Sequence, residues 1–409
     1  MADSRIKFDR YVGTYARRLD TMRASAVRDL FAAASRSDII SLSGGMPDIS
    51  VLPLDQVAQV AAAAITEEGL AALQYGSTDG RLETRQLVAE LVRDHGIMGL
   101  DPADVIITTG AQQALDIIPK TFVDPGDVIL AEGPTYLGAL QAFSAYQPQV
   151  RCIPMDDEGM RMDLLEEELK RLASEGIAPK FLYTIPNFQN PAGATMSLEK
   201  RKGMYELAKK YGVLIIEDNP YGDLRVSGED IPTIKSMDTD GLVVYSGSFS
   251  KIVAPGIRVG FLSAPKEVVS KLVVAKQTQD VHTPLISQLT VYKWLTECDI
   301  EKHIEHIRTI YRRKLNLLCD CLDKELGGFL TYHRPEGGLF VWAKIRDGVD
   351  MLEFCKRSSA LGVSVVPGNA FMVDMSQKSQ YIRLNFSTPT DENIVKGVRL
   401  LAQAAKSFE

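Results

Sequence analysis

The central part of the chain alternates short apolar runs with longer amphipathic segments. The short runs, several of them rich in β-branched residues, lie at residues 104–109, 127–131, 180–184, 213–217, 242–245 and 259–262. Between them, the spacing of apolar positions predicts helices from Ala111 to about Phe122 and from Ser197 to Tyr211, the second ended by Gly212. Apolar strands separated by helices predict a parallel or mixed sheet that is covered by helices on both faces.

The pattern changes after about residue 285. Residues 286–326 are expected to be long and helical, and two further apolar runs, 337–342 and 381–386, are separated by another helix. The sequence therefore predicts a large α/β unit and a smaller α/β unit, joined by the long helical segment.

Length and charge narrow the class of protein. A chain of 409 residues allows two or three domains. Lys and Arg number 46 against 53 for Asp and Glu, and the resulting net charge of −7 argues against a nucleic-acid or anionic-lipid partner. The charged N-terminus is unlike a secretory signal, and no apolar run of about 20 residues predicts a membrane span. The odd count of five cysteines, without C-x-x-C, is typical of reduced thiols, so we expect a cytoplasmic protein.

Polar residues follow several apolar runs, where ligands bind in sheets of this kind. Gly110-Ala111-Gln112 opens a helix whose backbone N–H groups suit a phosphate, although a plain strand-to-helix turn explains it equally. Asp218 ends another run, where a buried carboxylate needs a partner, as in a salt bridge or a helix cap. The turn Asn187–Gly193 holds amides above the sheet, or is turn chemistry alone.

A cluster of hydroxyl groups and cations follows the run at 242–245. Ser248, Ser250, Lys251 and Arg258 lie within the 13 positions 246–258, which suggests an anion site. A lysine in a desolvated pocket can lose its proton and form a Schiff base, whereas an isolated lysine is usually a solvated surface charge. The phosphate-loop and dinucleotide glycine signatures are absent from the sequence. No metal site is expected, because His303 and His306 lack a third ligand.

Taken in order, these segments resemble the fold-type-I, pyridoxal-phosphate-dependent aminotransferases of class I/II. The matching motifs are Ser43–Pro47, Gln74–Gly76, Gly110–Leu115, Asn190–Gly193, Asp218–Tyr221, Ser248–Lys251, Arg258–Gly260 and Tyr381–Leu384. Each motif alone is weak, but together their order and spacing are specific and cover nearly the whole chain. The sequence is most similar to the subgroup of 2-aminoadipate, kynurenine and branched-chain or aromatic aminotransferases.

The resemblance implies roles for individual residues. Lys251 would hold pyridoxal 5′-phosphate as a Schiff base and then act as a general base. Asp218 would keep the pyridine nitrogen protonated. Tyr221 and Asn190 would hold the phenolic oxygen of the ring, and Tyr136 would stack on the ring. Lys251, Asp218 and Tyr221 are thus the expected catalytic residues.

The remaining expected contacts concern the phosphate and the substrate. The resemblance implies that the phosphate is held by Gly110, Ala111, Gln112, Ser248, Ser250 and Arg258, with Tyr75 reaching it from a neighbouring subunit of a homodimer. Relatives often carry Ser or Thr in place of Ala111, so somewhat weaker phosphate binding is expected here. The substrate would be bound by Arg383, Asn190 and Gly45, with Arg28 facing a distal carboxylate or, alternatively, exposed on its helix.

The expected function is amino-group transfer between an L-amino acid and a 2-oxo acid. Glutamate and 2-oxoglutarate are expected to be one substrate pair. The other pair is expected to be 2-aminoadipate, or an aromatic or branched-chain amino acid, with its 2-oxo acid. The alternatives are a pyridoxal-phosphate-dependent lyase on the same fold and a sensor related to pyridoxal-phosphate-domain transcription regulators. The expected parts are a segment with a lid helix at 1–50 packing with the small domain, a large cofactor-binding domain at 51–290 and a small domain at 291–409.

Overall fold

A computed structural model describes residues 15–16, 18–22 and 39–408 of the chain. Its largest element is an eight-stranded sheet with the order β2-β9-β8-β7-β6-β3-β4-β5. The strands are β2 (Val105–Thr108), β3 (Val128–Gly133), β4 (Gln149–Asp156), β5 (Gly159–Met160), β6 (Phe181–Thr184), β7 (Leu214–Asn219), β8 (Val243–Ser248) and β9 (Gly260–Ser263). From β8 to β4 the strands are parallel, whereas β9 is antiparallel to both β2 and β8. The predicted mixed sheet is confirmed.

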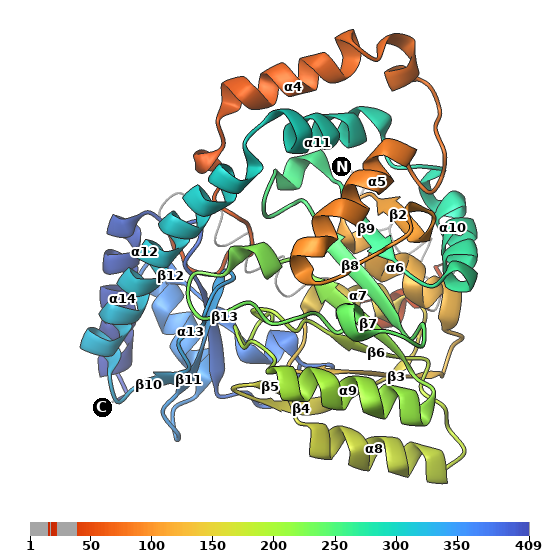
Figure 1. Cartoon of the computed structure of the whole chain (residues 1–409). Coiled ribbons are helices and arrows are strands. Elements are labelled where there is room, and N and C mark those ends of the chain that lie inside the picture. Colours follow the sequence, from red (N-terminus) through yellow and green to blue (C-terminus); the bar gives the residue numbers. More distant parts are fainter. Residues whose placement is uncertain (1–14, 17, 23–38, 409) are drawn as a thin grey trace, which may run out of the picture.

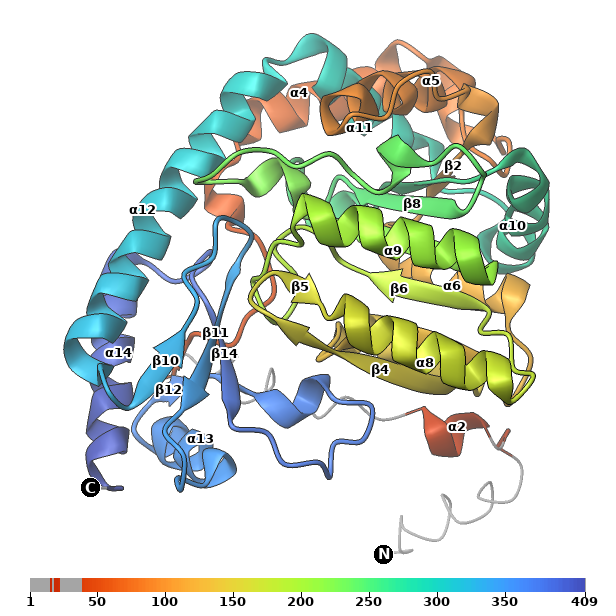
Figure 2. The same cartoon turned by 60° about the horizontal axis from the view of Figure 1, so that its bottom comes forward.

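Helices cover both faces of this sheet (Figure 2). On one face lie α8 (Met162–Ser174) and α9 (Leu198–Tyr211), which pack with Leu130, Leu182 and Ile215. The adjacent strand positions point the other way, toward α6 (Ala111–Phe122), α7 (Leu137–Ser144) and α10 (Lys266–Asp280). Because successive side chains of a strand alternate between faces, a run that is apolar throughout requires this double cover.

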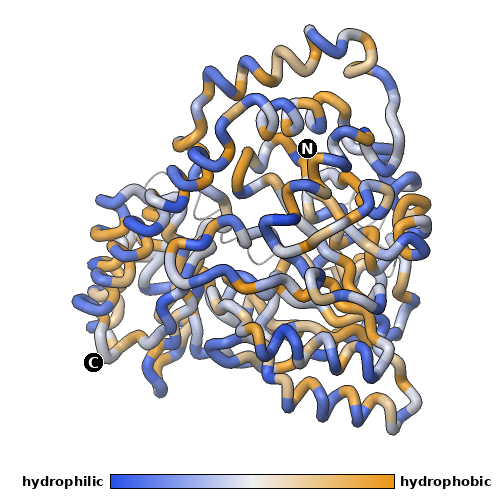
Figure 3. The backbone as a smooth tube through the Cα atoms, in the orientation of Figure 1, coloured by the Kyte–Doolittle hydropathy of each residue, from blue (hydrophilic) through white to orange (hydrophobic). Residues whose placement is uncertain are grey.

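A second group of helices packs beside the β2 end of the sheet. It consists of α4 (Leu54–Thr66), α5 (Leu82–Leu91) and α11 (Leu285–Glu297), seen at the top of Figure 1. The tube in Figure 3 shows hydrophilic and hydrophobic stretches alternating along these outer helices, as expected for helices with one exposed face. No helix within the described ranges is long and apolar enough to cross a membrane.

The C-terminal part forms the smaller α/β unit. The helix α12 (Ile300–Leu326) leads to a four-stranded antiparallel sheet with the order β10-β11-β14-β13, flanked by α13 (Met351–Ala360) and α14 (Asp391–Lys406). Its strands are β10 (Leu330–Tyr332), β11 (Phe340–Ile345), β13 (Val366–Pro367) and β14 (Tyr381–Asn385). The short α2 (Arg18–Thr21) is seen at the lower right of Figure 2.

The N-terminal segment joins the smaller unit through strand pairing. The strand β1 (Ile40–Ser41) is parallel to β12 (Val363–Ser364), with Ile40 opposite Val363. We propose the division of the chain at residues 50/51 and 290/291, which this pairing supports for the first part. The lid helix expected in 1–50 falls mostly outside the described residues.

Two predicted elements differ in extent from the structure. The helical segment 286–326 is two helices rather than one, because α11 ends at Glu297 and the Asp299 side chain caps α12 by accepting from the backbone N–H of Lys302, at 3.0 Å. Strand β7 continues through Asp218 and Asn219, which were expected to follow it. Asp218 is therefore held by sheet hydrogen bonding on a rigid strand.

Candidate active site

The candidate site lies at the carboxyl ends of the parallel strands, where the chain from β8 reaches Lys251. Lys251 is half-buried, and its Nζ donates to the backbone carbonyl of Gly45 at 3.2 Å. Its Nζ also lies 5.8 Å from the centre of the Tyr221 ring. Burial, followed by the charges of Arg383 and Arg258, lowers the pKa of Lys251 to about 8. The amine is therefore partly neutral near neutral pH, as a nucleophile or general base must be.

Asp218 is a buried carboxylate with one unsatisfied oxygen. Only 2% of the residue is exposed. Its Oδ2 accepts a hydrogen bond from the Tyr183 hydroxyl at 2.8 Å, but its Oδ1 has no hydrogen-bond partner among the described residues. The nearby Ser246 hydroxyl also favours the charged form without making a hydrogen bond of normal geometry. Burial dominates and raises the pKa of Asp218 to about 6.

The orphaned Oδ1 decides which ligand fits here. A buried carboxylate without a partner is costly, and a cationic N–H donor at Oδ1 would relieve that cost. The protonated pyridine nitrogen of pyridoxal phosphate is such a donor, and Lys251 supplies the amine that the cofactor requires. The residues present therefore fit this cofactor.

Aromatic and amide side chains surround the space between Lys251 and Asp218. Tyr221 is buried and packs edge-on against Phe340, with ring centres 6.0 Å apart. Burial raises the pKa of its hydroxyl, whereas the neighbouring Asn190 amide opposes that shift. Tyr136 caps the start of α7, and burial followed by the charge of Asp218 raises its pKa. Both phenols therefore remain protonated hydrogen-bond donors at neutral pH.

A cradle suited to a phosphate lies at the start of α6. Gly110 caps the helix with a φ of 74°, and a Cβ at this position would lie 2.4 Å from Nη2 of Arg258. The positive φ, which other residues rarely adopt, therefore favours glycine here, and its missing side chain lets the guanidinium approach closely. The first-turn N–H groups of Ala111 and Gln112 and the positive end of the helix dipole face the same region.

The other members of the cradle come from the chain after β8. Arg258 adopts a left-handed conformation with a φ of 59°, and its Nη1 donates to the carbonyl of Pro255 at 3.2 Å. The backbone N–H of Ser250 donates to Oγ of Ser248 at 3.2 Å. The Gln112 side chain instead points to α7, where its Nε2 donates to the Gly138 carbonyl at 3.0 Å.

Arg383 is a buried guanidinium in a defined frame. It is 4% exposed and lies between the rings of Phe340 and Phe371, 4.1 and 4.9 Å from their centres. Its Nη1 donates to Oδ1 of Asn190 at 2.9 Å, and Nη2 donates to the Ser43 carbonyl at 3.0 Å. Burial lowers the pKa of Arg383 to about 10, so it is still charged at neutral pH. A substrate carboxylate suits a buried cation of this kind.

Of the sequence-predicted residues that the structure describes, Tyr75 is not brought to this cluster within its own chain. Tyr75 is 80% exposed, with its ring edge-on to His282 at 5.8 Å. Arg28 lies outside the described residues. Gly45 is near Arg383, but its carbonyl accepts from Lys251, while the carbonyls of Ser43 and Gly44 face the guanidinium.

Sequence reasoning missed several supporting residues. Tyr183, on β6, holds Asp218, and Phe340 lies over the Arg383 guanidinium. The buried Glu132 at the end of β3 accepts from the Thr184 hydroxyl, and burial raises its pKa to about 7. The only sequence signal for Tyr183 and Glu132 is a polar atom inside an otherwise apolar strand.

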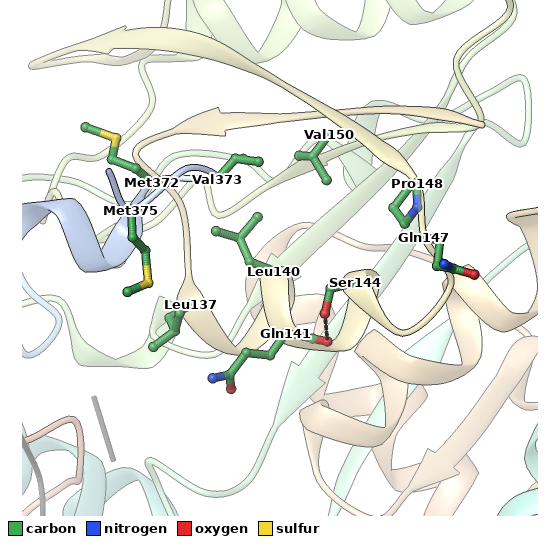
Figure 4. A pocket seen from close by; sticks show the side chains of 10 residues that line it. All are labelled: Leu137, Leu140, Gln141, Ser144, Gln147, Pro148, Val150, Met372, Val373 and Met375. Carbon is green, nitrogen blue, oxygen red and sulfur yellow. Dashed lines mark hydrogen bonds between the residues drawn. The ribbon is translucent and has the colours of Figure 1, made fainter. Parts of the chain in front are cut away.

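A separate surface pocket of about 260 Å³ lies between α7 and the segment 372–375 (Figure 4). It is lined by Leu137, Leu140, Gln141, Ser144, Gln147, Pro148, Val150, Met372, Val373 and Met375. None of these side chains is charged, and none belongs to the cluster around Lys251. The pocket therefore offers no cationic side chain to a phosphate or a carboxylate.

The fold and the site define a pyridoxal-phosphate-dependent aminotransferase. The chain belongs to the family of aminotransferase class I and II, whose model matches residues 37–401. It is 42% identical over 385 residues to aromatic-amino-acid aminotransferase 1 of Thermococcus litoralis, covering 94% of this chain and 92% of the relative.

Two solved structures are similar along almost their whole length. One is the kynurenine aminotransferase of Pyrococcus horikoshii in complex with PMP, 39% identical with a TM-score of 0.92 and 97% of each chain covered. The other is the α-aminoadipate aminotransferase of Thermus thermophilus complexed with N-(5′-phosphopyridoxyl)-L-leucine, 36% identical with a TM-score of 0.89, covering 97% and 98%. Amino-group transfer and the pyridoxal phosphate cofactor are thus confirmed, and the lyase and sensor alternatives are not favoured.

Proposed function

We propose that Lys251, Asp218 and Tyr221 are the catalytic residues of this aminotransferase. The observation that carries the proposal is the pairing of a lysine of lowered pKa with a buried carboxylate whose Oδ1 has no partner among the described residues. Bound pyridoxal 5′-phosphate supplies an electron-withdrawing ring that stabilises the electron pair left when the substrate Cα is deprotonated. Asp218, in its ionised form, holds a proton on the ring nitrogen through Oδ1.

The same proposal assigns proton handling to Lys251. Its neutral Nζ takes the proton from the substrate Cα and holds it beside the reacting atoms. Tyr221 and Asn190 would orient the ring by donating hydrogen bonds to its phenolic oxygen, and Tyr136 would stack on it. These groups stand at strand ends and in short turns packed against the core, which holds their side chains in place.

The remaining groups are proposed to bind the phosphate and the substrate carboxylate. The phosphate is held by the N–H groups of Ala111 and Gln112 after Gly110, by Ser248 and Ser250, and by Arg258. Arg383 binds the α-carboxylate through paired hydrogen bonds, with Asn190 and Gly45 beside it. Its burial supports this role, since a carboxylate would satisfy the Nε group that has no partner within the described structure.

The proposed substrates are glutamate and 2-oxoglutarate as one pair, and 2-aminoadipate or an aromatic or branched-chain amino acid with its 2-oxo acid as the other. The similar proteins support part of this range, because they are named for aromatic amino acids and 2-aminoadipate. Arg28 is the proposed partner of the distal carboxylate. A panel of amino acids assayed with 2-oxoglutarate, following glutamate formation, tests the range. Turnover that proceeds without any 2-oxo acid would instead indicate lyase chemistry.

We further propose a cytoplasmic homodimer in which Tyr75 completes the phosphate site of the partner. The support is an exposed apolar surface around it, where Leu70 and Leu73 are 86% and 60% exposed. Mixing Lys251→Ala subunits with Tyr75→Phe subunits should restore activity, because one of the two sites in each heterodimer keeps both residues. A fully active monomer at assay concentration would contradict shared sites.

A further inference from the structure

Glu132 is a buried carboxylate that the proposed chemistry does not use. It is the penultimate residue of strand β3 and is fully buried. Its Oε1 accepts from the Thr184 hydroxyl at 2.5 Å, and its Oε2 accepts from the backbone N–H of Ile185 at 3.1 Å and from Nε2 of Gln189 at 3.0 Å. Three donors on one carboxylate fix its position and offset part of the cost of burying it.

Gln189 extends this contact into the turn that follows β6. Besides its bond to Glu132, its Nε2 donates to the Pro134 carbonyl at 2.9 Å, and its Oε1 accepts from the backbone N–H of Ala192 at 2.8 Å. The backbone N–H of Gln189 donates to the Ala194 carbonyl at 2.9 Å, which closes the turn. One side chain therefore fastens the turn to the end of β3 and sets its internal shape.

Asn190 is the residue that this turn presents to the candidate site. Its Oδ1 accepts from Nη1 of Arg383 at 2.9 Å, and its amide neighbours the Tyr221 hydroxyl. It lies outside any helix or strand, so its position depends on what anchors the turn. A displacement of even 1 Å would change its contact to both partners at once.

We propose that Glu132, acting through Gln189, is a positioning residue that sets Asn190 for cofactor and α-carboxylate binding. The inference rests on the proposed role of Asn190. Glu132 touches neither cofactor nor substrate; it holds the Gln189 amide, and the Gln189 amide holds the turn.

The main test is Gln189→Met in the holoenzyme, with two readouts. The variant keeps the side-chain length but loses the bonds to Glu132, Pro134 and Ala192. We expect the KM for the amino donor to rise about tenfold with a smaller change in kcat, and the pH titration of the bound-cofactor absorbance to shift. In an Asn190→Ala background, the same substitution should add less than about a twofold effect, because the Glu132–Gln189 contact acts through Asn190.

Two matched variants separate positioning from general disruption. Glu132→Gln should stay within about twofold of the wild type, since its amide nitrogen can donate to Oγ1 of Thr184 while its oxygen still accepts from Ile185 and Gln189. Thr195→Val, in the same turn, removes a buried hydroxyl with no hydrogen-bond partner in the described structure and should leave KM and the spectrum unchanged.

Different results would refute the positioning role of Glu132 and Gln189 and the proposed role of Asn190. Wild-type KM and spectrum in Gln189→Met, or an equal added loss in the Asn190→Ala background, would overturn the positioning role while leaving Asn190 in the site. An Asn190→Ala enzyme with normal KM and spectrum would refute the role of Asn190 itself. If Gln189→Met does not fold, Gln189→Asn replaces it, because its amide is one methylene too short to span the same contacts.

Discussion

The Asp218→Asn substitution should stabilise the cofactor-free enzyme while destroying its function. The carboxylate is buried, and one of its oxygens has no partner within the described structure. Its pKa rises from an ordinary 3.8 to about 6, which means that carrying the charge near pH 7 costs the folded state about 3 kcal/mol. Asparagine carries no charge and can still accept the Tyr183 hydrogen bond, so this cost disappears in the variant.

The stability difference between Asp218→Asn and the wild type should depend on pH in a defined direction. A carboxyl group whose pKa is raised in the folded state destabilises the fold above that pKa, and the penalty fades as the pH falls toward the unfolded value. For Asp218 the penalty of about 3 kcal/mol near pH 7 falls below about 1 kcal/mol near pH 4. The stability difference between variant and wild type should therefore shrink by about 2 kcal/mol across this range. The shrinkage is independent of any constant cost of burying the new amide.

Urea denaturation of both cofactor-free proteins at matched subunit concentration measures this difference at each pH. Adding pyridoxal phosphate should then reverse the order, because the cofactor stabilises the wild type far more than Asp218→Asn. A stability difference that stays constant between pH 7 and pH 4 would show that the pKa of Asp218 is not raised in the folded protein. Equal stabilisation of both proteins by the cofactor would show that Oδ1 does not face its cationic nitrogen.

Three further outcomes are expected. The rate at which the cofactor-free enzyme takes up pyridoxal phosphate should rise with pH and level off above about pH 8, because the pKa of Lys251 is lowered to about 8. A rate that continues to rise up to pH 10.5 would show that the pKa of this amine is not lowered. Arg383→Lys should lower kcat/KM for amino acids by about 10- to 100-fold, because one charge-assisted bond of a pair is lost, and should leave slow turnover of amines lacking the carboxylate nearly unchanged; equal losses for both would contradict α-carboxylate binding. Arg28→Gln should lower kcat/KM for glutamate and 2-aminoadipate by about 10- to 100-fold and should change kcat/KM for leucine or phenylalanine little. Equal losses for all four substrates would show that Arg28 has a structural role.

Much of the fold could be predicted from the sequence because the signals are local. The apolar runs of β3, β6, β7 and β8 are apolar on both faces, and Gly212 ends α9 in the expected left-handed conformation, with a φ of 67°. The break between α11 and α12 was not predicted, because only Cys298 and Asp299 separate the two helices. Its signal is the Asp299 cap, which resembles any other polar helix residue in the sequence.

The candidate site, like the fold, could be predicted from the sequence only in part. Lys251, Asp218 and Arg383 occur in ordered motifs, so the resemblance to a family singles them out from the sequence alone. The hydrogen-bond partners of these residues could not be found in this way, because they are distant in sequence. Examples are the carbonyls of Ser43 and Gly44 at Arg383 and the contact between Glu132 and Gln189. The unsatisfied Oδ1 of Asp218 likewise becomes evident only in the folded structure. Burial and hydrogen-bond geometry, rather than residue type, distinguish these groups from ordinary polar positions.

The most direct test of the central claim is the chemical identity of the residue that carries the cofactor. Borohydride reduction of the purified enzyme followed by peptide mass mapping should locate the phosphopyridoxyl group on Lys251. The Lys251→Ala protein should carry none and should have lost transamination between glutamate and a 2-oxo acid. A phosphopyridoxyl group on another lysine, or full activity in Lys251→Ala, would contradict the account.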